Sequence, residues 1–280
     1  MASRRLLPLA AVACFALSPA AKSQTPSPLQ EWQYSGGIAL QKLFEPQMPD
    51  WRVVLGTATE AEPTYEGARP YRFRVGPVIN VQYKDLAFAS LGEGLGVNLL
   101  RADHYRVGVA VGYDLGRHIS VDYPHLHGLE DIASAPVVRV FGSYVISKEF
   151  PLVLRADVRR IVGGADGMVG DVEAFLPLPG SSKRLIMFAG PSYTFANRQH
   201  MQTSFGVNAS QALASGYPVF LAHGGSNSAG IGFSATGFIT DHWLVNVDTA
   251  VNYLLGSTRD SPITQSTTQG VLAISAEYMW

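Results

Sequence analysis

The chain has 280 residues, of which 47% are apolar and 15% are charged, and its formal net charge is -1. Soluble domains usually carry about 25% charged residues. A disordered chain is excluded, because disorder requires low hydrophobicity and a high net charge. A nucleic-acid partner is not expected, because proteins that bind nucleic acids carry a basic excess. The length fits one large domain or two small ones.

Residues 1–23 are predicted to form a secretory signal peptide. Arg4 and Arg5 provide a positive start, and Leu6–Leu17 is an uncharged, almost wholly apolar stretch. This stretch is too short for a transmembrane helix, which needs about 20 apolar residues. Cleavage after Ala20 or after Ser23 would leave small residues at the recognition positions, so we expect export of the chain.

The single cysteine, Cys14, lies within this predicted signal. The mature chain is therefore expected to have no disulfide, no thiolate metal site and no cysteine nucleophile. Residues 24–50 are predicted to be a periplasmic tail, in which Gln33–Phe44 is apolar enough to plug or cap the base of the domain that follows. Residues 51–280 are predicted to form that domain.

The mature chain shows repeated alternation of apolar and polar residues with period 2, which predicts strands. In Tyr105–Gly116, one face carries Val107, Val109 and Val111, and the other carries glycine, alanine, Arg106 and Asp114. Further strands are expected at Trp51–Thr59, Tyr71–Tyr83, Val137–Ile146, Leu152–Arg159, Asp171–Leu176, Lys183–Phe195, Ala229–Ile239, Trp243–Leu255 and Val271–Trp280.

The length of these runs favours a transmembrane barrel over a soluble sandwich. Several span about twelve residues, whereas sandwich strands have about five or six and a tilted membrane strand needs about 9 to 11. Aromatic residues stand at both ends of the apolar faces, as Tyr71 and Tyr83 do, which is typical of the girdles around a hydrocarbon band. The fold class predicted is all-β: a closed, transmembrane antiparallel β-barrel of the bacterial outer-membrane type.

Short and long connections alternate along the chain, as expected for short periplasmic turns and long outer loops. Treating Leu86–Ser90 and Gly94–Leu100 as two short strands gives about 12 strands, and omitting this pair gives ten. The last strand ends on an aromatic residue and resembles the terminal strand of outer-membrane barrels. Tyr278 and Trp280 are therefore interpreted as an assembly signal, with the barrel assembly machinery as a partner.

Four stretches resemble the MipA/OmpV family of MltA-interacting outer-membrane proteins, over about Trp51 to Trp280. They are Pro63-Thr64-Tyr65-Glu66-Gly67, Gly92–Leu100, the loop from Met201 to Pro218, and Asp260-Ser261-Pro262-Ile263. The resemblance implies a barrel, with a scaffold role between a murein transglycosylase and a murein synthase described for one member. Other members are linked to adhesion, permeability or stress responses. The family offers no catalytic signature to transfer to this chain.

Charged residues on the polar faces are predicted to point into the lumen. Two hypotheses remain open: a salt-bridge network that fills the interior, because buried charges must be paired, or a constriction that selects ions. The predicted lumen residues are Arg72, Arg74, Arg106, Asp114, Arg139, Arg155, Asp157, Arg159, Asp171, Glu173, Arg184, Asp248 and Glu277.

Other candidate groups lie near the predicted outer end. Arg160 has the parity of the lipid face, where its side chain would reach the interface or contact lipopolysaccharide phosphate. One long loop contains His118, Ser120, His125, His127 and Asp131. The spacing of His125 and His127 would suit a metal, and a His-Ser pair would suit an acyl hydrolase, although loops often carry histidines without chemistry. His200 and His223 in the longest loop are interpreted in the same way.

The function predicted first is a structural scaffold of the cell envelope, located in the outer membrane after signal cleavage. The alternatives are a narrow pore and, third, a surface hydrolase. Outer-membrane lipid and lipopolysaccharide are the expected surroundings. No cofactor, metal or enzymatic activity is assigned.

Overall fold

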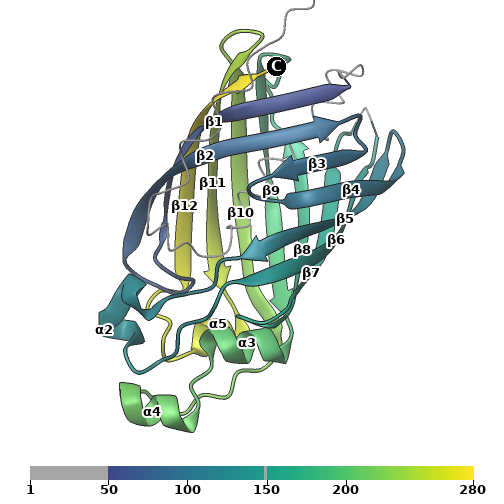
Figure 1. Cartoon of the computed structure of the whole chain (residues 1–280). Coiled ribbons are helices and arrows are strands. Elements are labelled where there is room, and N and C mark those ends of the chain that lie inside the picture. Colours follow the sequence, from purple (N-terminus) through teal and green to yellow (C-terminus); the bar gives the residue numbers. More distant parts are fainter. Residues whose placement is uncertain (1–49, 148–149) are drawn as a thin grey trace, which may run out of the picture.

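A computed structural model describes residues 50–147 and 150–280. The predicted signal, nearly all of the predicted tail and its segment Gln33–Phe44 lie outside these residues. Twelve antiparallel strands close into one barrel, in which each strand pairs with its neighbours in sequence and β1 pairs with β12 (Figure 1). The prediction of a closed 12-strand barrel is confirmed, and the ten-strand alternative is wrong.

The strand bounds agree with the predicted alternation to within a few residues at most ends. They are β1 Trp51–Pro63, β2 Tyr71–Tyr83, β3 Ala87–Ser90, β4 Gly94–Arg101, β5 Tyr105–Asp114, β6 Ala135–Val145, β7 Val153–Ile161, β8 Gly167–Pro177, β9 Leu185–Ala196, β10 Gly225–Phe238, β11 Trp243–Leu254 and β12 Thr268–Met279.

Among the described residues, five short helical segments accompany the barrel, and the labelled ones gather at the end of the barrel opposite the C-terminus (Figure 1). They are η1 Ile119–Asp122, α2 Tyr123–Leu126, α3 Arg198–Phe205, α4 Ala209–Ser215 and α5 Gly256–Asp260. We call this the long-loop end and the opposite one the short-turn end. Within the described residues, no helix is both long and apolar enough to span a membrane.

The apolar face of the strands points outward, as the alternation predicts. In β7, Arg155, Asp157 and Arg159 are buried inside, whereas the intervening Leu154 and Val158 are exposed. In β5, Val111 is 53% exposed, while the inward-facing Ala110 and Asp114 are buried. An outer surface of valine and leucine is stable only against an apolar solvent, so this face suits acyl chains.

The interior is apolar near both ends. At the short-turn end, Val145, Val153, Phe175, Ile186 and Phe188 form a buried cluster, with the Phe175 and Phe188 rings 5.4 Å apart. Close packing here replaces the water that would otherwise fill the base of the lumen.

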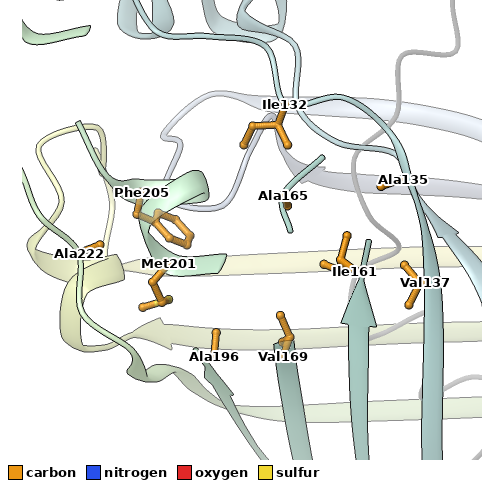
Figure 2. Packing of buried hydrophobic residues seen from close by; sticks show 10 residues of the cluster. All are labelled: Ile132, Ala135, Val137, Ile161, Ala165, Val169, Ala196, Met201, Phe205 and Ala222. Atoms are coloured by element: carbon orange, nitrogen blue, oxygen red, sulfur yellow. The ribbon is translucent and has the colours of Figure 1, made fainter. Parts of the chain in front are cut away.

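The long-loop end is closed by its own loops. Ile132, Ala165, Met201, Phe205 and Ala222 come from loops and helix α3 and pack against the inward-facing ends of four strands (Figure 2). Those strand residues are Val137, Ile161, Val169 and Ala196. A second cluster joins Tyr65, Leu126, Val207 and Ile263 from four different loops. We call these two clusters together the loop cap.

The wall is interrupted at one place, because the β3–β4 hairpin is short. The four residues of β3 pair with Asn80–Tyr83 of β2, and β4 pairs with β5 only as far as Val111. The hairpin turn, residues 91–93, therefore lies part of the way up the wall. Its Glu93 is buried and reaches Arg155 inside the barrel.

Candidate functional site

A charged layer crosses the middle of the barrel on β6, β7 and β8. Arg159 Nη1 lies 2.7 Å from Asp171 Oδ2 and 3.7 Å from Asp157 Oδ1, and Arg139 Nε lies 3.8 Å from the same Asp157 oxygen. Thr194 Oγ1 donates a 2.5 Å hydrogen bond to Asp171. All four charged side chains are at most 9% exposed. This geometry is a paired, buried network.

The layer continues through Arg155, whose Nη2 donates to Glu93 Oε1 over 3.2 Å. Glu173 is buried and lies directly opposite Arg155 in the β7–β8 pairing. Sequence reasoning missed Glu93, since a residue in a turn was not expected to point inward. It does so because the hairpin ends below the rim of the wall.

Except for Arg184, the other predicted lumen residues lie on strands that surround the same interior. Arg72 and Arg74 both contact Glu62 Oε1, at 2.7 and 3.0 Å, and Arg106 forms an ion pair with Asp85. Asp248 accepts from Asn246, and Ser275 donates to Glu277 over 2.5 Å. Glu62 was also missed, although it stands opposite Arg72 in the β1–β2 register.

Arg184 was predicted to point into the lumen, and the structure contradicts this prediction. Arg184 precedes β9, its side chain is 73% exposed, and its nearest acidic partner is Asp241, 3.9 Å away in a short turn. The turn hydrogen bond from Ser182 N to Leu185 O holds this part of the chain out of the strand. Arg184 therefore lies outside the lumen.

The predicted assembly residues lie in an aromatic group at the short-turn end. The Tyr278 ring meets Trp243 and Trp280 edge-on, with centroids 5.2 and 4.5 Å away. Trp280 is 59% exposed, as an interfacial side chain would be. Their role as an assembly signal stays a prediction.

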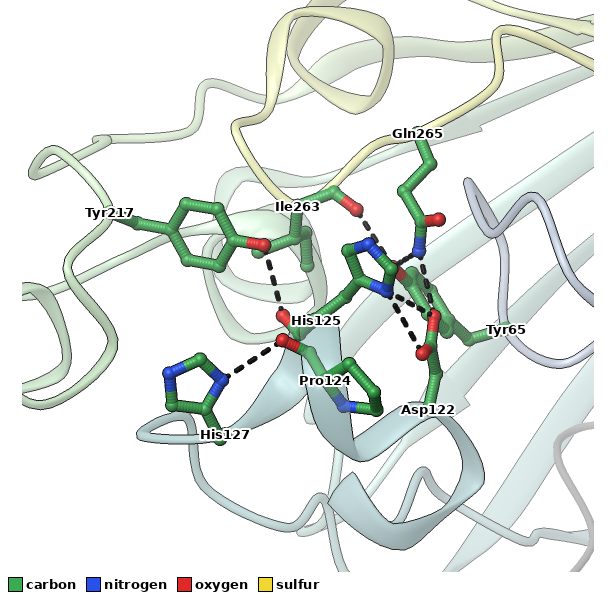
Figure 3. Close-up of polar contacts among 8 residues, drawn as sticks. All are labelled: Tyr65, Asp122, Pro124, His125, His127, Tyr217, Ile263 and Gln265. Carbon is green, nitrogen blue, oxygen red and sulfur yellow. Dashed lines mark hydrogen bonds and ion pairs between the residues drawn. The ribbon is translucent and has the colours of Figure 1, made fainter.

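The histidine loop is tied into the loop cap by polar contacts (Figure 3). Gln265 Nε2 donates to Tyr65 Oη and to Asp122 Oδ2, both over 2.7 Å, and Tyr65 Oη donates to the Ile263 carbonyl. His125 contacts Asp122 at 3.0 Å. Burial raises the pKa of Tyr65 to about 12, so this phenol stays a neutral donor. These contacts join three loops far apart in the sequence.

The two candidate metal ligands in this loop engage different partners. His125 faces Asp122, whereas His127 Nδ1 bonds to the Pro124 carbonyl over 3.0 Å (Figure 3). No group of three or more metal-ligating side chains occurs among the residues that the structure describes. His118 Nδ1 lies 2.9 Å from Asp131 Oδ2, and the Asp131 carboxylate also accepts from the Ile119 amide.

Arg160 lies on the outer surface near the long-loop end. Its guanidinium is 42% exposed and lies 2.8 Å from Asp166 in the β7–β8 turn. This position agrees with the prediction that Arg160 lies on the lipid-facing side of its strand. Contact with lipopolysaccharide phosphate stays a prediction.

Between the charged layer and the loop cap lies a cavity of about 200 Å³, which we call the chamber. Its lining includes Glu66, Asp114, Arg117, Arg159 and His200. Burial lowers the pKa of His200 to about 4 and that of Arg117 to about 10, so His200 is neutral and Arg117 is charged at pH 7. Sequence reasoning singled out neither Arg117 nor Glu66, because only the folded loops bring them to this place.

Glu66 is a chamber residue whose pKa lies near neutral pH. Protein atoms surround Glu66, and its carboxylate accepts a 2.8 Å hydrogen bond from Asn227. Part of the side chain stays exposed, because it faces the cavity. Burial raises the pKa of Glu66 to about 7.

Glu66 makes the stability of the folded state depend on pH. Because the folded state holds the Glu66 proton up to about pH 7 and the unfolded state loses it near 4.5, stability should fall as pH rises from about 4.5 to 7. Glu66→Gln keeps an acceptor for Asn227 and should flatten this part of the profile. Urea unfolding in lipid vesicles at pH 5, 6, 7 and 8 measures it. An unchanged slope in the variant would contradict this assignment.

Residues 55–280 match the family model described as MltA-interacting protein MipA. No curated protein sequence matched the chain. Among solved structures, the chain is similar to the NanC porin, with 8% identity, a TM-score of 0.45, and coverage of 80% of this chain and 98% of the porin.

Two further solved structures are similar in the same way. One is the translocator domain of the autotransporter NalP from Neisseria meningitidis, with 14% identity, a TM-score of 0.43, and coverage of 93% of this chain and 99% of that one. The other is OmpT of Vibrio cholerae, with 10% identity, a TM-score of 0.37, and coverage of 82% and 97%. The closed strand pairing establishes the barrel independently of these likenesses.

Proposed function

Because the chain belongs to the MipA family of MltA-interacting proteins, we propose that it is an outer-membrane scaffold that holds a murein transglycosylase at its periplasmic face. The partner comes from the family description, which names an interacting protein and not an enzyme. A murein synthase recruited to the same face belongs to this proposal, and so does export by the predicted signal peptide.

The observation that supports a scaffold over a pore is the filled interior. An apolar cluster occupies the short-turn end, paired charges cross the middle, and the loop cap covers the long-loop end. A porin lumen, in contrast, is polar and filled with water. The charges of this barrel are used in contacts with one another, which favours structure over solute selection.

The short-turn end is the face expected to meet the partner. Short turns of outer-membrane barrels lie on the periplasmic side, and Asp50 and Trp280 lie at this end of β1 and β12. Its turns carry exposed charged groups, among them Asp241, which is 92% exposed, and Arg184. These side chains are free to contact a protein in the periplasm.

Photocross-linking in whole cells tests the scaffold role. A photoreactive phenylalanine analogue at Asp241, in a short turn, is expected to capture a murein transglycosylase. The same analogue at Leu213 is the control, because Leu213 is 91% exposed on α4 at the opposite end. Equal capture from both positions, or no capture of a murein enzyme from any short turn, would contradict the proposal.

A further inference from the structure

The outer half of the barrel wall has a gap between β2 and β5. Among the described residues, the stretch Tyr71–Val78 of β2 pairs with β1 on one edge and with no strand on the other. Across from it, Gly112–Asp114 of β5 pairs with β6 only. Eight residues of strand span roughly 26 Å. Figure 1 shows β2 and β5 diverging beyond the β3–β4 turn. We call this the β2–β5 gap.

On the β2 side of the gap, two large outward apolar side chains are more exposed than those of other strands. Phe73 and Val75 on the outer face of β2 are 78% and 72% exposed, against 53% for Val111. A Cβ atom added at Gly76 would meet no atom within 4 Å. On the inner face, Arg74 is 30% exposed, whereas Arg155 is 3% exposed. No described side chain fills this part of the wall.

The chamber lies beside this gap. Its lining comes from β1 and from β5 and β7 to β12, with their loops, but from none of β2, β3 and β4. Glu62 and Pro63 at the end of β1 line one side, and Asp114 and Arg117 line the other. The strands absent from the lining are β2, β3 and β4, which surround the gap, and β6, which is paired on both edges. The gap is therefore the candidate opening of the chamber toward the membrane.

Arg117 gives the chamber a cation that forms no ion pair within the described part of the chain, and Asp131 acts on it electrostatically from the histidine loop. Its Nη1 donates to the Ser204 carbonyl over 2.7 Å, and its guanidinium lies 5.7 Å from the centre of the Tyr65 ring. Its Nε is buried and makes no hydrogen bond, and neither does Nδ1 of His200. A buried Nε–H without a hydrogen bond is costly unless a ligand accepts from it.

None of the described acidic groups nearby forms an ion pair with Arg117. Asp131 is engaged by His118 and the Ile119 amide. Glu62 is held by Arg72 and Arg74, and Asp114 accepts from the Gly116 amide over 2.7 Å. Glu66 bonds to Asn227. The site that stays open around Arg117 fits an anionic oxygen.

We propose that the chamber binds the carboxylate or phosphate head of a single-chain amphiphile, which enters from the outer leaflet through the β2–β5 gap. Arg117 binds the head by a charge-assisted hydrogen bond. The tail lies in the gap beside Phe73 and Val75. This site is independent of the proposed scaffold role, which uses the opposite end of the barrel.

The test is binding of a dansyl-labelled undecanoic acid to the full chain in lipid nanodiscs. Unlabelled laurate is expected to displace the probe, whereas dodecanol and dodecylamine are not. Arg117→Gln should weaken binding at least tenfold, as expected for loss of a charge-assisted contact. Arg160→Gln is the matched control, because Arg160 lies on the outer surface and pairs with Asp166.

A second pair of variants tests the route of entry. Gly76→Trp places a ring on the inner face of β2 beside the gap and should slow association severalfold. Gly142→Trp is its control on β6, because an added Cβ there makes only ordinary contacts of 3.7 to 3.8 Å.

Each of the following results would overturn the proposal. They are no binding of the probe, equal binding in the Arg117→Gln variant, equal displacement by dodecylamine, and equal association rates for the two tryptophan variants. Binding that occurs only after deletion of residues 24–49 would assign the gap to that segment and also overturn it.

Discussion

Asp171→Ala is expected to destabilise the barrel by about 3–5 kcal/mol, the cost of removing one partner from a buried ion pair. Asp171 is 3% exposed and is the close partner of Arg159, at 2.7 Å. The variant leaves this arginine with Asp157, 3.7 Å away, and removes the acceptor of Thr194. The free energy of unfolding by urea in lipid vesicles measures the loss.

Asp241→Ala is the matched control, since it removes the same chemical group from an exposed pair. Asp241 is 92% exposed and lies 3.9 Å from Arg184. Exposed pairs contribute about 0–1 kcal/mol, so little change is expected. Similar losses in the two variants would mean that the interior charges are solvated and not paired, as an open lumen would require.

Val140→Arg is expected to cost about 2–4 kcal/mol, because it places a charge on the membrane-facing surface near the middle of β6. Val140 is 53% exposed, and its neighbour across the β6–β7 pairing, Val158, also faces outward. Equilibrium unfolding in vesicles, together with the yield of folded barrel, measures the cost.

The effect of such a charge should depend on depth. Ile146→Arg places the same charge just beyond the short-turn end of β6, where Ile146 is 42% exposed. Near the interface the cost falls to about 0–1 kcal/mol. If both variants were tolerated equally well, the surface around Val140 would not be in contact with acyl chains.

The wall of the barrel was predictable because its signal is local. Alternation along β7 alone places Arg155, Asp157 and Arg159 on one face and Leu154 and Val158 on the other, and the structure has the same arrangement. The period of two is a property of the extended backbone, so each strand carries its own evidence. The error at Arg184 arose where alternation continued into a turn that bends the chain away.

The interior contacts and the loop cap were not predictable, because they depend on distances between remote segments. Glu93 reaches Arg155 only because the hairpin that carries it is short. Tyr65 and Gln265, 200 residues apart in sequence, meet only after the barrel closes. Arg117 gave no signal in its own segment, since its significance comes from the cavity that it lines.

Single-channel recording in planar bilayers tests the filled interior most directly. The full-length barrel is expected to show no steady conductance steps, because an apolar cluster, paired charges and the loop cap close the lumen at three levels. A water-filled porin inserted under the same conditions serves as the positive control. Regular, sizeable steps from the purified barrel would contradict the account and favour a solute channel.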